Sequence, residues 1–170
     1  MVRIEPASPA DLPVIWDLYQ SIWLATYLNE AAGVTQAAAE KYLFEVRKPS
    51  MLDRWQRCIA NPEAEQRCLF VAREGGEILG MVVPSITAGK HQLNGLYVRP
   101  EVRGKGIGTQ LLETALDWIG DNDSYLYVAP YLPLPQKLYE EYGYKLANNQ
   151  VHYFKDNPVP HLLMERSVEP

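Results

Sequence analysis

A glycine-rich segment between an apolar strand and an amphipathic helix constrains this chain more than any other feature. Leu93 and the apolar run at residues 96–98 predict a buried strand, and apolar residues recur at helical spacing over residues 107–119. Three glycines fall within residues 104–108, so they lie at the helix start. Without Cβ atoms the backbone can approach a ligand closely, and the unpaired N–H groups of the first helical turn attract an anion. The segment therefore indicates a phosphate-binding loop.

The spacing within this loop excludes two common nucleotide-binding loops. A Walker loop ends in Gly-Lys-Ser/Thr, whereas Lys105 is followed by Gly106. A dinucleotide-binding fingerprint requires glycine where Thr109 stands. What remains is an arginine followed by two spaced glycines, given by Arg103, Gly106 and Gly108. A glycine-rich turn without any ligand is the alternative reading.

With Val98-x-Pro100 ahead of it and a leucine-rich helix behind, this pattern resembles the GNAT superfamily of acyl-CoA-dependent N-acetyltransferases. Residues 138–144 are similar to that family's Leu-Tyr-Glu-x-x-Gly-Phe signature. The resemblance implies that the loop amides bind the pyrophosphate of acetyl-CoA and that the preceding strand contacts its pantetheine arm. The residues expected to contact acetyl-CoA are Leu96, Tyr97, Val98, Arg103, Gly104, Lys105, Gly106, Ile107, Gly108, Thr109 and Tyr139.

The resemblance also implies catalytic roles. The backbone N–H of Val98 corresponds to the donor for the oxyanion, and Tyr139 corresponds to the acid that protonates the departing thiolate. A phenol has a pKa of about 10 and is protonated at neutral pH. Many family members carry a glutamate base where this chain has Gln92, so we expect either His91 or a water chain ordered by Gln92, Asn94 or backbone carbonyls. The proline-rich residues 130–135 also depart from the family pattern.

The end of the first predicted helix supplies candidates for an acceptor site. Trp23, Tyr27 and Glu30 could bind an ammonium group through aromatic faces and a carboxylate, with Asn94 as a further contact. The alternative is that Trp23 packs in the core and Glu30 is an exposed loop acid. The predicted function is transfer of an acetyl group to a small primary amine, a polyamine as first choice. A protein or peptide acetyltransferase and a non-catalytic acyl-CoA-binding sensor are the alternatives.

Composition narrows the class of protein. The 170 residues, 47% of them hydrophobic, predict a single domain over residues 1–170. A net charge of -5 gives no reason to expect nucleic acid and mildly favours a cationic substrate. Cys58 and Cys68 with three scattered histidines indicate neither a disulfide framework nor a metal site. With no membrane-length apolar run and no signal-peptide pattern, we expect a cytoplasmic protein without a membrane partner.

Periodicity and turn residues predict an α/β fold with a central mixed, twisted sheet flanked by helices, which is also the architecture that the resemblance implies. We expect residues 84–90 to be a connecting loop that contributes to substrate recognition, and the aromatic strand at 144–154 to pair in a homodimer. The predicted strands are 2–5, 68–73, 77–83, 92–98, 125–128, 144–154 and 161–166. The predicted helices are 12–23, 35–46, 50–60, 106–120 and 134–142.

Overall fold

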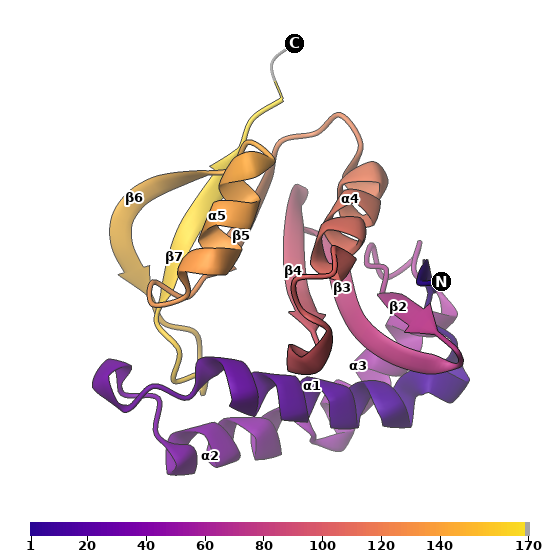
Figure 1. The fold of residues 1–170 in the computed structure, drawn as a ribbon, viewed down its shortest axis with the longest axis horizontal. Coiled ribbons are helices and arrows are strands. Elements are labelled where there is room, and N and C mark those ends of the chain that lie inside the picture. Colours follow the sequence, from indigo (N-terminus) through magenta and orange to yellow (C-terminus); the bar gives the residue numbers. More distant parts are fainter. Residues whose placement is uncertain (169–170) are drawn as a thin grey trace.

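A seven-stranded mixed sheet organises the computed structural model, which describes residues 1–168 (Figure 1). Its strand order is β1-β2-β3-β4-β5-β7-β6, and only the β4–β5 pair is parallel. The strands are β1 (Arg3–Pro6), β2 (Phe70–Glu74), β3 (Glu77–Thr87), β4 (Lys90–Val98), β5 (Ser124–Val128), β6 (Lys145–His152) and β7 (His161–Arg166). The predicted fold class is confirmed.

Five α-helices flank the sheet, close to the predicted positions. They are α1 (Leu12–Tyr27), α2 (Gln36–Val46), α3 (Pro49–Ala60), α4 (Ile107–Ile119) and α5 (Pro133–Glu141). Short 3-10 helices lie at Pro9–Asp11, Glu30–Ala32 and Pro100–Val102. Among the helices of residues 1–168, none combines the length and the apolar character needed to cross a membrane.

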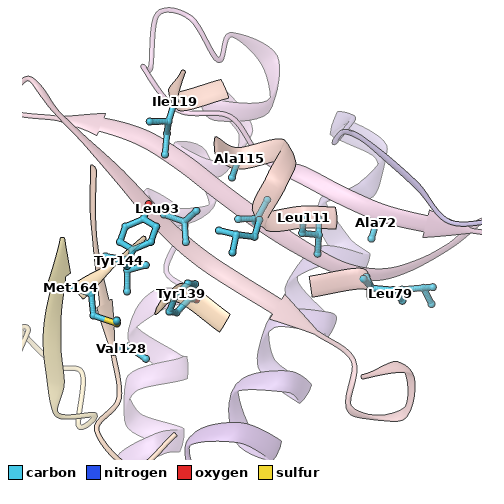
Figure 2. Close-up of a cluster of buried hydrophobic side chains, with 14 residues drawn as sticks. Ala72, Leu79, Leu93, Leu111, Ala115, Ile119, Val128, Tyr139, Tyr144 and Met164 are labelled. Carbon is cyan, nitrogen blue, oxygen red and sulfur yellow. The ribbon is translucent and has the colours of Figure 1, made fainter. Parts of the chain in front are cut away.

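Two clusters of buried side chains hold α1 and α4 to opposite faces of the sheet. On one face, Leu111, Ala115 and Ile119 of α4 pack with Leu93 of β4, as Figure 2 shows. Tyr139 and Tyr144 join the same cluster beside Val128 and Met164, with their ring centroids 6.1 Å apart. On the other face, buried residues of α1 pack against β2 and β3. Removing these apolar surfaces from water is the main force that fixes the helices on the sheet.

The predicted loop at residues 84–90 is wrong. Strand β3 continues to Thr87, and a two-residue turn at Ala88 and Gly89, both with positive φ, leads directly into β4. Pro84 argued for a loop, because proline lacks the N–H that a sheet needs. However, the Pro84 carbonyl accepts from the Cys68 N–H at 3.1 Å, so the Pro84 nitrogen faces the segment just ahead of β2, beyond the last pair of the β2–β3 ladder. Cys58 and Cys68 are both free and buried.

Strands β4 and β5 pair at one end and separate at the other. Their register joins His91 to Ser124 and Gln92 to Tyr125, and the named pairing ends there. Further along β4 a bulge places Gly95 and Leu96 opposite Val82, and Gly95 has a φ of 56°. A bulge bends its strand and increases the local twist. The two halves of the sheet therefore form a wedge that opens beyond Gln92.

Candidate active site

The glycine-rich loop leads from the open end of β4 into helix α4. Gly104 and Gly106 have φ angles of 76° and 79°, which other residues adopt only with strain, and a Cβ at either position would meet nothing within 4 Å. Glycine is therefore needed here for conformation, and the space beside the loop is open. Gly106 caps α4, so the N–H groups of Ile107, Gly108 and Thr109 lack acceptors within the helix. The predicted anion-binding geometry is present.

Arg103 fixes the loop to two other elements. Its Nε donates to the carbonyl oxygen of Val98 at 3.0 Å, and one terminal nitrogen donates to Thr26 Oγ1 of α1 at 2.8 Å. The side chain thus holds the loop against the end of β4 and the last turn of α1. Because its donors are already partly used, Arg103 contributes to this site first as a support for the loop.

A cavity of about 430 Å³ lies in the wedge beside the loop, and we call it the apolar cavity. Most residues predicted to bind acetyl-CoA line this cavity. Lys105 and Gly106 in the adjoining loop, and Thr109 in the first turn of α4, are not part of its wall. Residues 132–135 of the proline-rich segment, which departs from the family pattern, form another part of the wall. The lining residues are Ile22, Thr26, Tyr27, Leu96, Tyr97, Val98, Val102, Arg103, Gly104, Ile107, Gly108, Tyr127, Val128, Ala129, Leu132, Pro133, Leu134, Pro135, Leu138 and Tyr139.

A second cavity, of about 500 Å³, adjoins the first, and we call it the polar cavity. Five residues line both cavities and mark the boundary between them: Tyr27, Leu96, Tyr97, Tyr127 and Tyr139. The remaining residues of the polar cavity are Tyr42, Val46, Arg54, Gln92, Leu93, Asn94, Gly95, Phe154, Lys155, Asn157 and His161. A molecule in each cavity would meet its neighbour at these five residues.

Tyr139 lies at that boundary, on helix α5. It is 7% exposed, and its ring packs edge-on against Tyr144. Burial raises the pKa of the Tyr139 phenol far above its usual value, and the nearby Tyr27 and Tyr144 add to the effect. The hydroxyl therefore keeps its proton throughout the neutral range.

The backbone N–H of Val98 points toward the apolar cavity. The next N–H, that of Arg99, donates to the Leu79 carbonyl of β3 at 2.9 Å. Because successive residues of a strand direct their N–H groups to opposite sides, the Val98 N–H faces away from β3. On that side β5 has already separated from β4. Val98 thus presents a donor that the sheet does not use.

The structure places two of the predicted acceptor contacts in the polar cavity and two elsewhere. Tyr27 and Asn94 line the cavity, and Asn94 Nδ2 donates to Ser85 Oγ at 2.9 Å. Trp23 is only 1% exposed and packs behind Tyr27, while Glu30 lies exposed in the 3-10 helix after α1 and lines neither cavity. The expectation that Trp23 and Glu30 contact the acceptor is therefore corrected. Helix α2 covers the face of α1 that carries Trp23, and Glu30 lies beyond the end of α1, outside both cavities.

His91 does not meet Tyr139. It lies at the closed end of the wedge, in a separate hollow with Asp121 and Arg166. Gln92 is one residue further along β4 and lines the polar cavity, where its Oε1 accepts a hydrogen bond from the Tyr125 hydroxyl at 3.1 Å. Of the candidates for moving a proton, Gln92 and Asn94 thus face the acceptor side and His91 does not.

Three basic side chains of the polar cavity were not predicted from the sequence. Arg54 comes from α3, and Lys155 and His161 come from the segment around the β6–β7 connection. Burial lowers the pKa of His161 to about 4, so its imidazole is neutral at pH 7. No local motif marks these residues, since they meet only in the folded chain. Within residues 1–168 no group of three or more His, Cys, Asp and Glu side chains is arranged to hold a metal ion.

Comparison with known proteins identifies the family. Residues 65–146 match the acetyltransferase (GNAT) domain. An uncharacterized N-acetyltransferase of Bacillus subtilis (strain 168), YhfO, is 31% identical over an alignment of 108 residues that covers 58% of this chain and 72% of the relative. The chain therefore belongs to the GNAT family, and it is an acetyl-CoA-dependent acyltransferase.

Solved structures agree with this fold along the whole chain. The PaiA N-acetyltransferase of Thermoplasma acidophilum, in complex with coenzyme A, has a TM-score of 0.76 and 23% identity, over 98% of this chain and 99% of that one. The ribosomal-protein-S18-alanine N-acetyltransferase of Escherichia coli has a TM-score of 0.67 and 17% identity, over 100% of this chain and 96% of that one. At these identities the likeness concerns the fold, so the acceptor must be argued from this chain's own residues.

Proposed function

We propose that this protein transfers the acetyl group of acetyl-CoA to the primary amine of a small molecule by direct attack while both substrates are bound. The observation that supports the proposal is the meeting of two cavities at Tyr139. The apolar cavity and its glycine loop suit the pantetheine arm and pyrophosphate of acetyl-CoA. The polar cavity takes the amine. A cytoplasmic location and a homodimer stay predictions.

Tyr139 at the boundary and the Val98 N–H of the apolar cavity supply the chemistry in this proposal. The amine nitrogen forms a bond to the acetyl carbon and loses one further proton to water, and the carbon–sulfur bond of the thioester breaks. The Val98 N–H donates to the carbonyl oxygen as it becomes negative, because a donor fixed in advance stabilises developing charge. Tyr139 gives its proton to the departing sulfur and regains one from solvent after turnover.

The amine must lose a proton before it attacks. An alkylamine has a pKa of roughly 10, so at pH 7 about one part in a thousand is the free nucleophile. We assign the removal of this proton to a water chain ordered by Gln92 and Asn94, which line the polar cavity. His161 also lines it, but an imidazole with a pKa of about 4 is a weak base.

Release of free CoA thiol from acetyl-CoA tests the proposal. The purified protein is supplied with polyamines, amino acids, aminoglycosides and short peptides in turn, and mass spectrometry identifies the acetylated product. We expect release that depends on the amine, with stoichiometric product. Protection of the protein against heat by acetyl-CoA without release for any amine would contradict the proposed function and favour a sensor.

A further inference from the structure

The charged side chains of the polar cavity have one sign. Arg54 and Lys155 line it, and among the described lining residues there is no aspartate or glutamate. In a protein with a net charge of -5, this local excess of positive charge is opposite to the overall balance. The charge of a site, rather than that of the whole chain, decides which ligand it attracts.

Neither cation forms an ion pair in the described residues. Among the ion pairs within residues 1–168, none includes Arg54 or Lys155, whereas Arg57 on the same helix α3 pairs with Glu65 at 3.1 Å. Arg67 is a further cation near Arg54: burial first, and then the charge of Arg54, lower the pKa of Arg67, while the charge of Glu65 raises it. In this part of the chain, Arg54 and Lys155 thus have no carboxylate in direct contact and can bind an anionic group.

The position of these cations fixes which part of an acceptor meets them. The reacting amine must reach the boundary residues, because Tyr139 lies there and the Val98 N–H is next to them on the apolar side. Arg54 and Lys155 line the polar cavity alone and not the boundary. An acceptor placed for attack thus directs its far end toward two cations.

We infer that the acceptor is a small primary amine whose other end carries an oxyanion, a carboxylate or a phosphate-type group, rather than a second ammonium group. A guanidinium binds planar and tetrahedral oxyanions through paired N–H donors, and a lysine adds a mobile charge. The tyrosine rings at the boundary suit the amine end, since aromatic faces attract ammonium groups. This inference rests on the proposed function and names its acceptor class.

Four acceptors of nearly equal length test the inference, because they differ mainly at the far end: 4-aminobutanoate, 3-aminopropylphosphonate, butylamine and 1,4-diaminobutane. We expect kcat/KM for the better oxyanion acceptor to exceed that for the diamine by about tenfold or more, the usual size of a hydrogen bond to a charged group. The carboxylate and phosphonate members show which oxyanion the site prefers.

Variants then locate the effect. Arg54→Gln and Lys155→Gln should lower kcat/KM for the oxyanion acceptors by about tenfold, mainly through KM, and much less for butylamine. Arg54→Glu should raise kcat/KM for the diamine. Arg57→Gln is the matched control, because Arg57 is an exposed cation on the same helix that lines neither cavity.

The outcomes separate the inference from the proposed function. Equal or better turnover of the diamine, or an equal loss with all four acceptors in Arg54→Gln and Lys155→Gln, would overturn the inference and leave the acetyltransferase intact. No CoA release with any of the four acceptors or with the wider amine panel would overturn the proposed function, and the inference with it.

Discussion

The apolar and polar cavities are built in different ways, although they share five wall residues. The apolar cavity depends on backbone: two positive φ angles, a free strand N–H and a helix start, all within residues 98–109. The polar cavity depends on side chains from α2, α3, β4 and the β6–β7 connection. A backbone site tolerates varied side chains and is marked in the sequence by its glycines. A side-chain site changes its preference with single substitutions.

Tyr139→Phe tests whether the hydroxyl at the boundary between the cavities acts in the reaction rather than in binding acetyl-CoA. Loss of the proposed acid should lower kcat by about a hundredfold or more, because general acids contribute factors of that order. The affinity for acetyl-CoA, measured by thermal shift, should change little, since the ring remains. Tyr142→Phe is the control, as that hydroxyl bonds Glu113 away from the cavities. Full activity in Tyr139→Phe would contradict its role.

Gly106→Asp tests the backbone character of the apolar side. The substitution strains a φ of 79° and places negative charge where a pyrophosphate would bind, so we expect the KM for acetyl-CoA to rise about tenfold or more. Gly33→Asp is the matched control, because Gly33 has a φ of 80° with equal free space but lies far from the loop in sequence and lines neither cavity. If both variants raised KM equally, the effect would not be specific to the glycine-rich loop.

His161→Phe tests the polar side through its pH dependence. The folded protein lowers the pKa of His161 to about 4 from the ordinary 6.5, so the unfolded chain binds a proton more readily. This contribution to stability is present above pH 6.5 and is lost as the pH falls toward 4. We expect urea unfolding to show a loss of about 1–2 kcal/mol between pH 7 and pH 5 that the variant lacks. An unchanged pH slope would exclude His161 as its source.

Thr26→Val tests whether the hydrogen bond between Arg103 and α1 helps to hold the glycine-rich loop in the shape that binds acetyl-CoA. The substitution removes the acceptor of the 2.8 Å bond from Arg103 and keeps the bond from Arg103 to Val98. One exposed hydrogen bond contributes about 1 kcal/mol, so KM for acetyl-CoA should rise a few-fold without a change in kcat. Ser21→Ala on the same helix, which removes a bond to Leu18, is the control. Identical KM values would show that the loop holds its shape alone.

The acetyl-CoA side of the site could be predicted from the sequence, because the residues that form its loop and helix start are consecutive in the chain. Arg103 and the glycines at 104–108 carry their spacing with them, and the helix after them is periodic. The charged residues of the polar cavity could not be predicted, because Arg54 and Lys155 are about a hundred residues apart and no sequence pattern connects them. The sequence left Trp23 open between the core and the acceptor site for a related reason: its position on α1 does not reveal that α2 covers it.

The fold itself was predicted closely, apart from one segment. Apolar periodicity located the helices and most strands within a few residues. The prediction of a loop at residues 84–90 was wrong because the cost of a proline in a strand depends on which chain lies beside it. The Pro84 nitrogen faces the segment just ahead of β2, beyond the last pair of the β2–β3 ladder, and the local sequence does not reveal this neighbour.

Because β4 and β5 separate into a wedge, a ligand bound between them would change how firmly the two halves of the sheet are held together. In the described chain, two residue pairs, His91 with Ser124 and Gln92 with Tyr125, join the two half-sheets. A long, thin ligand lying between the free edges would add rungs to this ladder and brace both arms. Hydrogen exchange along residues 94–98 and 126–128 would then slow together, so the loaded protein would present its second substrate with a firmer frame than the empty one.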